Sequence, residues 1–188
     1  MIMNNYSRFP SIISRDCCGG VLYKKYNQQY TSPTIGLYMS NKDFVNLCLH
    51  LEEYIESPLF DSLEKGKNGY PIGLLKNEFG QIKIHFMHYA SFSEARIKWQ
   101  RRCNRIDYNN IRVVCDAKAN IDNEYIKLFA SIPYTKILLS SNMPDEYIFC
   151  YNMKCYQLEP DLESLVKRRP DGAGIYLDEV DWELFLKG

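Results

Sequence analysis

The sequence has no excess of either charge. Its 188 residues include 23 Lys and Arg against 23 Asp and Glu, so the formal net charge at pH 7 is zero. Proteins that coat nucleic acid or anionic membranes carry a positive excess. We therefore expect no nucleic-acid partner. The composition, 46% hydrophobic and 24% charged, is that of a folded domain rather than a disordered chain.

Targeting and membrane segments are also lacking. The N-terminal MIMNNYSRFP has neither a basic start nor an apolar core, so we expect no secretory signal. No apolar run approaches the ~20 residues of a membrane span. The seven cysteines are odd in number and form no C-x-x-C pair, which favours reduced thiols over a disulfide framework or a zinc site. The sequence predicts a cytoplasmic protein without membrane insertion and without a metal site.

Nucleotide fingerprints, repeats and linkers are absent from the sequence as well. Neither G-x-G-x-x-G nor G-x-x-x-x-G-K-[ST] occurs, so no cofactor can be named. We expect a single α/β domain over residues 1–188, with a possible small C-terminal subdomain over 140–188.

Strand-like and helix-like segments alternate along the chain. Strands are predicted over 9–14, 34–39, 72–75, 82–86, 111–115, 136–139, 147–151 and 174–177. Helices are predicted over 21–26, 40–55, 91–105, 122–131, 161–168 and 181–186, and a loop over 57–69. In the helix over 122–131, the expected inward residues are Tyr125, Leu128 and Phe129. The pattern predicts a three-layer, doubly wound, mixed but mostly parallel sheet, Rossmann-like without the dinucleotide fingerprint.

The loop after the first strand contains the most informative candidates. In such sheets, ligands bind at the carboxyl ends of the strands. Gly19 and Gly20 predict a tight turn that a ligand can approach closely. The following helix N-terminus would lower the pKa of a nearby thiol, so Cys17 is a candidate nucleophile and Asp16 a candidate base or orienting carboxylate. The alternative is a small-residue turn with a buried cysteine that acts as a small hydrophobe.

Two further strand ends supply candidate polar groups. His88 follows the strand over 82–86 and is a candidate general acid or base, or else a histidine hydrogen-bonded to backbone. His85 is expected to pack in the sheet, and the spacing of the two histidines is poor for a shared metal. Asp116 ends a buried strand, as either a ligand-binding carboxylate or a turn residue.

The predicted helix over 91–105 is rich in basic residues. Its period places Ala95, Trp99 and Cys103 on the buried stripe, and Lys98, Arg101 and Arg105 toward solvent. Arg102 falls beside the buried stripe, where a guanidinium needs an anionic partner. We expect either a bound anion or an internal ion pair.

Four blocks of sequence occur in order along the chain: ISRDCCGG (13–20), YTSPTIGL (30–37), IHFMHY (84–89) and KWQRRCNRI (98–106). Together they resemble a bacterial family of unknown function whose members are often labelled exopolysaccharide or capsule biosynthesis proteins, and the resemblance covers residues 8 to about 150. The first block of the family resembles Asn-Asn-Cys-Trp-Gly-Gly; Cys17 and the glycines match it, but the Asn and Trp positions do not. The resemblance implies a pocket formed by the first loop, the Ser32 to Thr34 turn and the His88 strand end.

Together these observations predict an enzyme of surface-polysaccharide assembly, a transferase that moves a sugar or acyl group from an activated donor. Arg102 or the amides of Gly19 and Gly20 would hold the donor phosphate, His88 would be the base, and Cys17 or Asp16 would position or attack. The alternatives are a Cys/His hydrolase and a non-catalytic scaffold for glycosyltransferases and other polysaccharide-assembly proteins. The enzymatic hypotheses depend on one expectation, that the first loop, His88 and the helix over 91–105 share one cavity.

Overall fold

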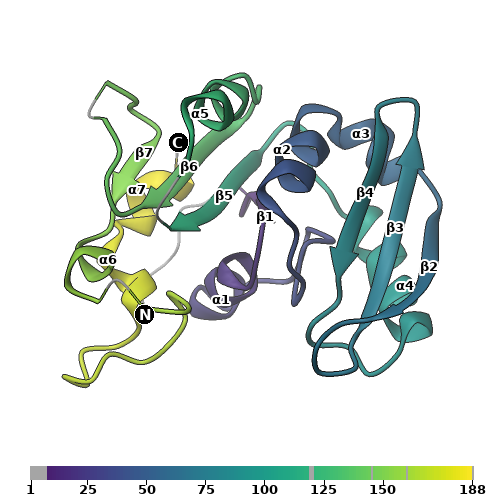
Figure 1. Ribbon diagram of the computed structural model, residues 1–188, viewed down its shortest axis with the longest axis horizontal. Helices are drawn as coiled ribbons and strands as arrows, with labels where there is room; N and C mark the ends of the chain where they lie inside the picture. Colours follow the sequence, from purple (N-terminus) through teal and green to yellow (C-terminus); the bar gives the residue numbers. More distant parts are fainter. Residues whose placement is uncertain (1–7, 119–120, 145, 160, 188) are drawn as a thin grey trace.

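The computed structural model describes residues 8–118, 121–144, 146–159 and 161–187 (Figure 1). Residues 1–7, from which the lack of a secretory signal is partly predicted, lie outside this part. The helices are α1 (Cys18–Lys25), α2 (Asn41–Leu49), α3 (Leu51–Glu56), α4 (Phe92–Cys103), α5 (Asn123–Ala130), α6 (Lys154–Leu158), the 3-10 helix η1 (Tyr176–Glu179) and α7 (Trp182–Lys187).

Two separate sheets organise the fold. The parallel sheet has the strand order β1-β5-β6-β7, and the antiparallel sheet has the order β2-β3-β4. The strands are β1 (Ser11–Ser14), β5 (Ile111–Lys118), β6 (Thr135–Ser140), β7 (Cys150–Asn152), β2 (Leu59–Lys65), β3 (Pro71–Asn77) and β4 (Gly80–His85). The two sheets stand side by side, with α1 and α2 near the junction (Figure 1).

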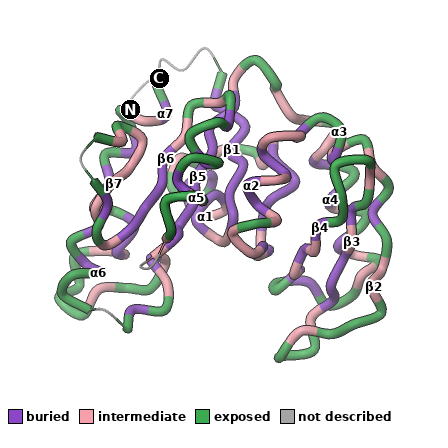
Figure 2. The backbone as a smooth tube through the Cα atoms, turned by 45° about the horizontal axis from the view of Figure 1, so that its top comes forward, coloured by how far each residue is buried: buried purple, intermediate pink, exposed green. Residues whose placement is uncertain are grey.

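Both faces of the parallel sheet are covered. Ile13 and Val113 face the apolar cluster that contains α2, α5 and the antiparallel sheet. Ile12 and Val114, their chain neighbours, face a second cluster with α1 and the C-terminal helices. A strand that is buried on both faces has a nearly continuous run of apolar residues in its sequence. This is why the sequence alone predicts β5. The buried residues concentrate along β1, β5 and β6 (Figure 2).

The predicted mixed α/β class is confirmed, but the arrangement differs in one respect. The antiparallel strands form a sheet of their own instead of joining the parallel one. The strand order of the parallel sheet advances in one direction from β1 to β7, so the doubly wound, Rossmann-like arrangement is not confirmed. The C-terminal residues, predicted as a possible subdomain over 140–188, pack against β1, β5 and α1 in the second cluster.

Several predicted elements are correct, and others are wrong for identifiable reasons. The hairpin β3-β4 and the helix α4 are confirmed, the latter with Ser91 accepting a hydrogen bond from the Glu94 amide (3.2 Å). The predicted loop over 57–69 contains β2, an edge strand whose polar residues face solvent. In α5, Leu128 is exposed and Ile126 takes the inward position. The helix predicted over 40–55 is interrupted at His50, which separates α2 from α3.

The C-terminal predictions are less accurate. No regular helix forms over 161–168, and the strand predicted over 174–177 contributes only the isolated bridge between Arg168 and Ile175. The terminal helix predicted over 181–186 is confirmed as α7.

A junction segment, Ser32 to Met39, joins the two sheets through its backbone. On one side, the Ser14 amide of β1 donates to Thr34 Oγ1 (2.9 Å) and the Met39 amide donates to the Arg15 carbonyl (3.0 Å). On the other side, Tyr38 and His85 of β4 exchange two backbone hydrogen bonds of 2.9 Å. The segment predicted as a strand over 34–39 is therefore a connector with a single bridge. It brings the carboxyl ends of β1 and β4 together.

We predict that Thr34→Val destabilises the fold by about 1–3 kcal/mol, because it leaves the buried Ser14 amide without an acceptor. Urea denaturation of the purified protein measures the difference. Thr135→Val, the same substitution at an exposed position of β6, is the control and should change stability by less than about 0.5 kcal/mol. Equal stability of the two variants would contradict the structural role of Thr34.

Candidate active site

Cys17 lies at the N-terminus of α1, directly after β1. The helix begins at Cys18 because two side chains accept hydrogen bonds from its first amides: Asp16 Oδ1 from Cys18 (3.0 Å) and Ser14 Oγ from Gly19 (3.1 Å). A Cβ at Gly19 would lie 2.8 Å from the Ser14 Cβ, so close packing requires glycine there. The predicted glycine turn is therefore wrong: Gly19 and Gly20 belong to the helix, and the Gly19 amide already has an acceptor.

His88 follows β4 and is positioned by the junction segment. Its amide donates to the Gly36 carbonyl (3.2 Å). Gly36 has a φ of +70°, and a Cβ at this position would lie 3.4 Å from the His88 Cβ. Glycine adopts this backbone conformation without strain. Gly36 thus allows the histidine to lie close against the connector.

The two side chains meet although they are 71 positions apart in the sequence. Cys17 Sγ lies 3.2 Å from His88 Nε2. This distance permits proton transfer from thiol to imidazole, the arrangement used by nucleophile and base pairs in covalent catalysis.

A pocket of about 480 Å³ surrounds this pair. Its lining includes Gly20 and Lys24 of α1 and Lys98 and Arg102 of α4. The expectation that the first loop, His88 and the helix over 91–105 share one cavity is confirmed. Lys98 was expected to face solvent, yet it lines this pocket. Lys98 and Arg102 are four residues apart and therefore lie on one helix face. This spacing is the sequence signal that places Lys98 in the same pocket as Arg102.

The Cys17 thiol is protonated at neutral pH. Burial and the neighbouring Asp16 raise the pKa of Cys17 to about 11. The expectation that the helix N-terminus lowers this pKa is therefore wrong, because loss of solvation and a nearby carboxylate both oppose the thiolate. The resting pair is a neutral thiol next to an imidazole.

Arg102 is buried in the wall of the pocket. Its Nη1 donates to the hydroxyl of Tyr89 (2.5 Å), and its guanidinium lies over the Tyr30 ring, 5.1 Å from the centroid. Among the described residues, no Asp or Glu forms an ion pair with it. Of the two expectations for Arg102, the internal ion pair is thus not observed.

Ser32 and Thr34, expected at the ligand site, are buried in the junction. Their hydroxyls lie 2.9 Å apart, and Thr34 also bonds β1. Neither residue lines the pocket of Cys17 and His88. Ser32 and Thr34 therefore help to hold the junction segment in place but do not line the pocket.

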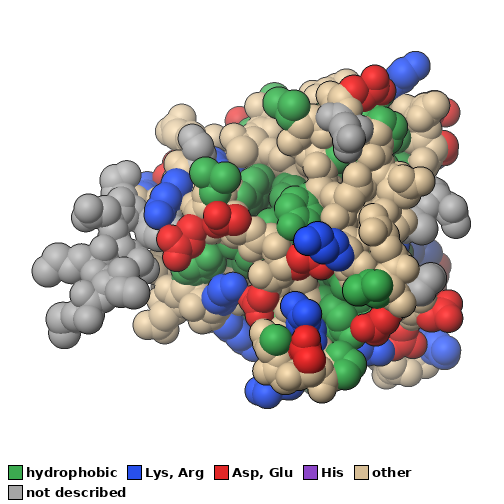
Figure 3. All heavy atoms as spheres, turned by 90° about the vertical axis from the view of Figure 1, so that its left-hand side faces the viewer, with side chains coloured by type: hydrophobic (Ala, Val, Ile, Leu, Met, Phe, Trp, Pro, Cys, Tyr) green, Lys and Arg blue, Asp and Glu red, His purple; other side chains and the backbone are tan. Residues whose placement is uncertain are grey.

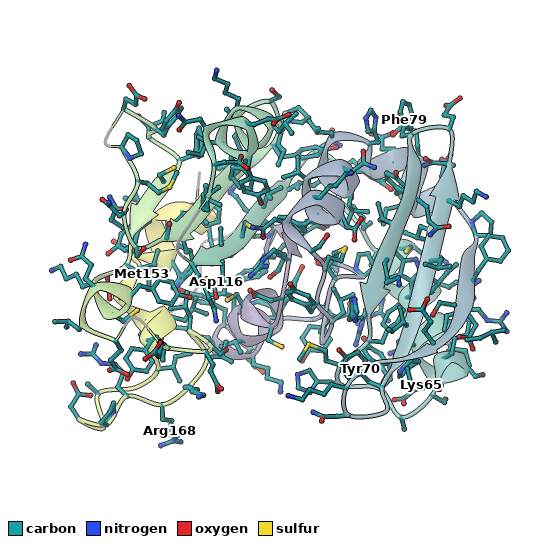
Figure 4. All side chains as sticks on the ribbon, in the orientation of Figure 1. Lys65, Tyr70, Phe79, Asp116, Met153 and Arg168 are labelled. Carbon is teal, nitrogen blue, oxygen red and sulfur yellow. The ribbon has the colours of Figure 1, made fainter. Side chains whose placement is uncertain are left out.

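Asp16 and Asp116 belong to a second, buried cluster beside the pocket. Asp116 lies near the carboxyl end of β5 (Figure 4), where Tyr156 donates to its Oδ1 (2.5 Å). Arg15 donates to the Asp116 carbonyl oxygen and lies 3.5 Å from Asp16 Oδ2. Burial, followed by the charge of Asp16, raises the pKa of Asp116 to about 6.

This cluster is a poor metal site, although ligand atoms of Asp16, Cys18 and Asp116 lie within 4.8 Å of one another. Burial, followed by the charge of Asp16, raises the pKa of the Cys18 thiol well above its ordinary value, so a metal would have to displace the thiol proton to bind there. The Arg15 guanidinium, 3.5 Å from Asp16 Oδ2, adds a like charge that a cation would face at this position.

These features define an α/β protein in which the cysteine that follows the first parallel strand lines a pocket together with a histidine and a buried arginine. The chain belongs to the family described as "Domain of unknown function (DUF1919)", whose profile matches residues 5–187. A relative from Haemophilus influenzae, named "Uncharacterized protein", is 27% identical over 174 residues, which are 92% of this chain and 81% of the relative. The resemblance to a family of unknown function is thus confirmed.

Within the described ranges, no helix combines the length and apolar character needed to cross a bilayer. On the face seen in Figure 3, basic and acidic side chains are interspersed.

We predict that the alkylation rate of Cys17 by iodoacetamide rises about tenfold per pH unit from pH 7 to about 10 without levelling off, because its thiol pKa is about 11. Peptide mapping after timed alkylation measures this rate. Glutathione in the same buffers is the control, and its alkylation rate should level off at a lower pH than that of Cys17. A plateau in the alkylation rate of Cys17 below pH 8 would contradict the raised pKa of its thiol.

We also predict a pH signature of Asp116. Its folded-state pKa lies above the ordinary 3.8, so the folded protein retains a proton that the unfolded chain releases, and stability falls as pH rises from about 4 to 6. Asp116→Asn cannot titrate. The free energy of unfolding of the wild type should therefore drop by roughly 2–3 kcal/mol relative to this variant between pH 4 and 7. Urea denaturation at each pH measures the two free energies of unfolding. If they change with pH in the same way, the raised pKa of Asp116 is refuted.

Proposed function

We propose that this chain is a cysteine-dependent transferase that moves an acyl group from an activated donor to an acceptor hydroxyl. The observation that supports the proposal is the 3.2 Å distance between Cys17 Sγ and His88 Nε2 inside a pocket. Cysteine is the most nucleophilic of the side chains used in covalent catalysis, and an adjacent base activates it. Such a pair suits acyl carbons better than glycosyl carbons, because the resulting thioester is itself reactive toward a hydroxyl.

The reaction divides into two balanced halves. In the first, His88 Nε2 takes the thiol proton while Sγ attacks the donor carbonyl; the bond from Sγ to carbon forms, the bond to the leaving group breaks, and the leaving group receives the proton. In the second, the acceptor hydroxyl gives its proton to His88 and attacks the thioester. Cys17 leaves as the thiolate and recovers the proton from His88. The raised pKa of Cys17 makes this base necessary, since little thiolate exists at neutral pH.

The biological setting of the proposal comes from the sequence resemblance. This resemblance supports a setting in exopolysaccharide or capsule assembly, in which we propose a sugar hydroxyl as acceptor and polysaccharide-assembly proteins as partners. A cytoplasmic location would keep the Cys17 thiol reduced.

The covalent step can be tested with p-nitrophenyl acetate, an activated ester without phosphate. We expect one acetyl group on Cys17 by intact-protein mass and peptide mapping. Cys17→Ala should abolish this adduct, and His88→Ala should slow its formation by about 100-fold or more, the usual contribution of a general base. Cys150→Ser, at another half-buried free cysteine, is the matched control. An acetyl group that forms equally well in Cys17→Ala would refute the proposal.

The alternatives differ in later steps. A hydrolase would release acetate from the Cys17 adduct at a rate that added sugar acceptors do not change. A non-catalytic scaffold would support normal polysaccharide output in cells that carry Cys17→Ala. Either result contradicts a transferase.

A further inference from the structure

The pocket beside Cys17 contains a buried cation, Arg102, for which the described residues provide no ion-pair partner. Arg102 is only 6% exposed, and its Nε is buried without a hydrogen-bond partner. Its Nη1 is held by the Tyr89 hydroxyl, which in turn donates to the Ile35 carbonyl (2.5 Å). These neutral contacts orient the guanidinium but do not neutralise it. Burying an unpaired charge is costly, so such an arginine is expected to serve an anionic ligand.

Two lysines, Lys24 and Lys98, add positive charge to the pocket beside Arg102. Lys24 of α1 forms no ion pair within the described part of the chain. Lys98 of α4 contacts Glu94 at 2.5 Å, but Glu94 does not line the pocket. The described lining residues therefore include three cations and no acidic residue. The pocket is positive although the chain as a whole is neutral.

From this arrangement we infer that the pocket binds the diphosphate group of the donor. The inference deepens the proposed function and rests on it, because it names the class of molecule whose acyl group reaches Cys17. Guanidinium groups match phosphate oxygens in a forked geometry, and several cations suit a ligand with more than one negative charge. The pocket volume of about 480 Å³ is within the ordinary range for small-molecule sites.

A diphosphate occurs in two classes of activated donor, coenzyme A thioesters and nucleoside diphosphate sugars. The shared chemistry is the diphosphate, and the covalent chemistry of Cys17 favours the thioester. Titrations with coenzyme A and with UDP separate the two sources.

The experiment is isothermal titration of the full chain with pyrophosphate, coenzyme A, UDP and, as a carboxylate comparison, glutarate. We expect pyrophosphate and at least one of the two larger ligands to bind, with affinity that decreases as salt increases. Lys24→Met and Arg102→Met should each weaken binding by about tenfold or more, the usual value of a charge-assisted hydrogen bond.

Neighbouring basic residues provide matched controls. Lys25 follows Lys24 in α1 but pairs with Asp178 (2.7 Å), and Arg101 precedes Arg102 on the exposed side of α4. Lys25→Met and Arg101→Met should change the affinity by less than about twofold. Because Arg102 is buried, circular dichroism must show that its variant folds; Lys24 is exposed, so its variant tests the inference independently.

The outcomes separate this inference from the proposed function. A wild-type protein that acylates Cys17 with p-nitrophenyl acetate but binds no pyrophosphate overturns the diphosphate site and leaves the proposed function intact. Pyrophosphate binding without acylation of Cys17 overturns the transferase and the donor assignment with it. Glutarate that binds as tightly as pyrophosphate would also overturn the inference. So would a Lys25→Met or Arg101→Met variant that weakens binding as much as Lys24→Met does.

Discussion

The junction segment from Ser32 to Met39 is the constraint on which the site depends. It hydrogen-bonds to β1 through Thr34 and Met39 and to β4 through Tyr38, so the carboxyl ends of two strands from different sheets are held together. Cys17 follows one strand and His88 the other. Without this connector the cysteine and the histidine would belong to separate layers. The hydrogen bond from the Ser14 amide to Thr34 is buried, which makes it costly to break and helps keep the distance between the two side chains defined.

Burial has opposite consequences for the two charged clusters near Cys17. In the Asp16 and Asp116 cluster, Arg15 lies 3.5 Å from Asp16 Oδ2 and donates to the Asp116 backbone carbonyl, and Tyr156 donates to Asp116 Oδ1. In the pocket, the hydrogen-bond partners of Arg102 within the described ranges, Tyr89 and the Ile35 carbonyl, are neutral. The first cluster thus contains a cation beside carboxylates, whereas the described residues that line the pocket include no carboxylate near Arg102. The same desolvation that raises the pKa of Cys17 makes an unpaired guanidinium an effective anion site, because charges interact more strongly away from water.

Much of the architecture could be predicted because it follows from local patterns. Continuous apolar residues predicted β5, and the Ser91 cap predicted the start of α4. The strand β2 was missed because an exposed edge strand lacks the apolar alternation that identifies buried ones. The prediction of a turn at Gly19 and Gly20 is wrong because the sequence does not distinguish a glycine that is required by close packing against Ser14 from a glycine that is required by a turn.

By itself, the sequence determined the α/β class, the candidate set of Cys17, His88 and Arg102, and the family to which the chain belongs. Only the tertiary structure decided which candidates share a pocket: it placed Gly20, Lys24 and Lys98 beside them and assigned Ser32 and Thr34 to the junction. It also reversed the expected direction of the Cys17 pKa shift. The physical reason is that residue type and spacing encode local conformation, whereas desolvation and charge pairing depend on neighbours that are distant in the chain.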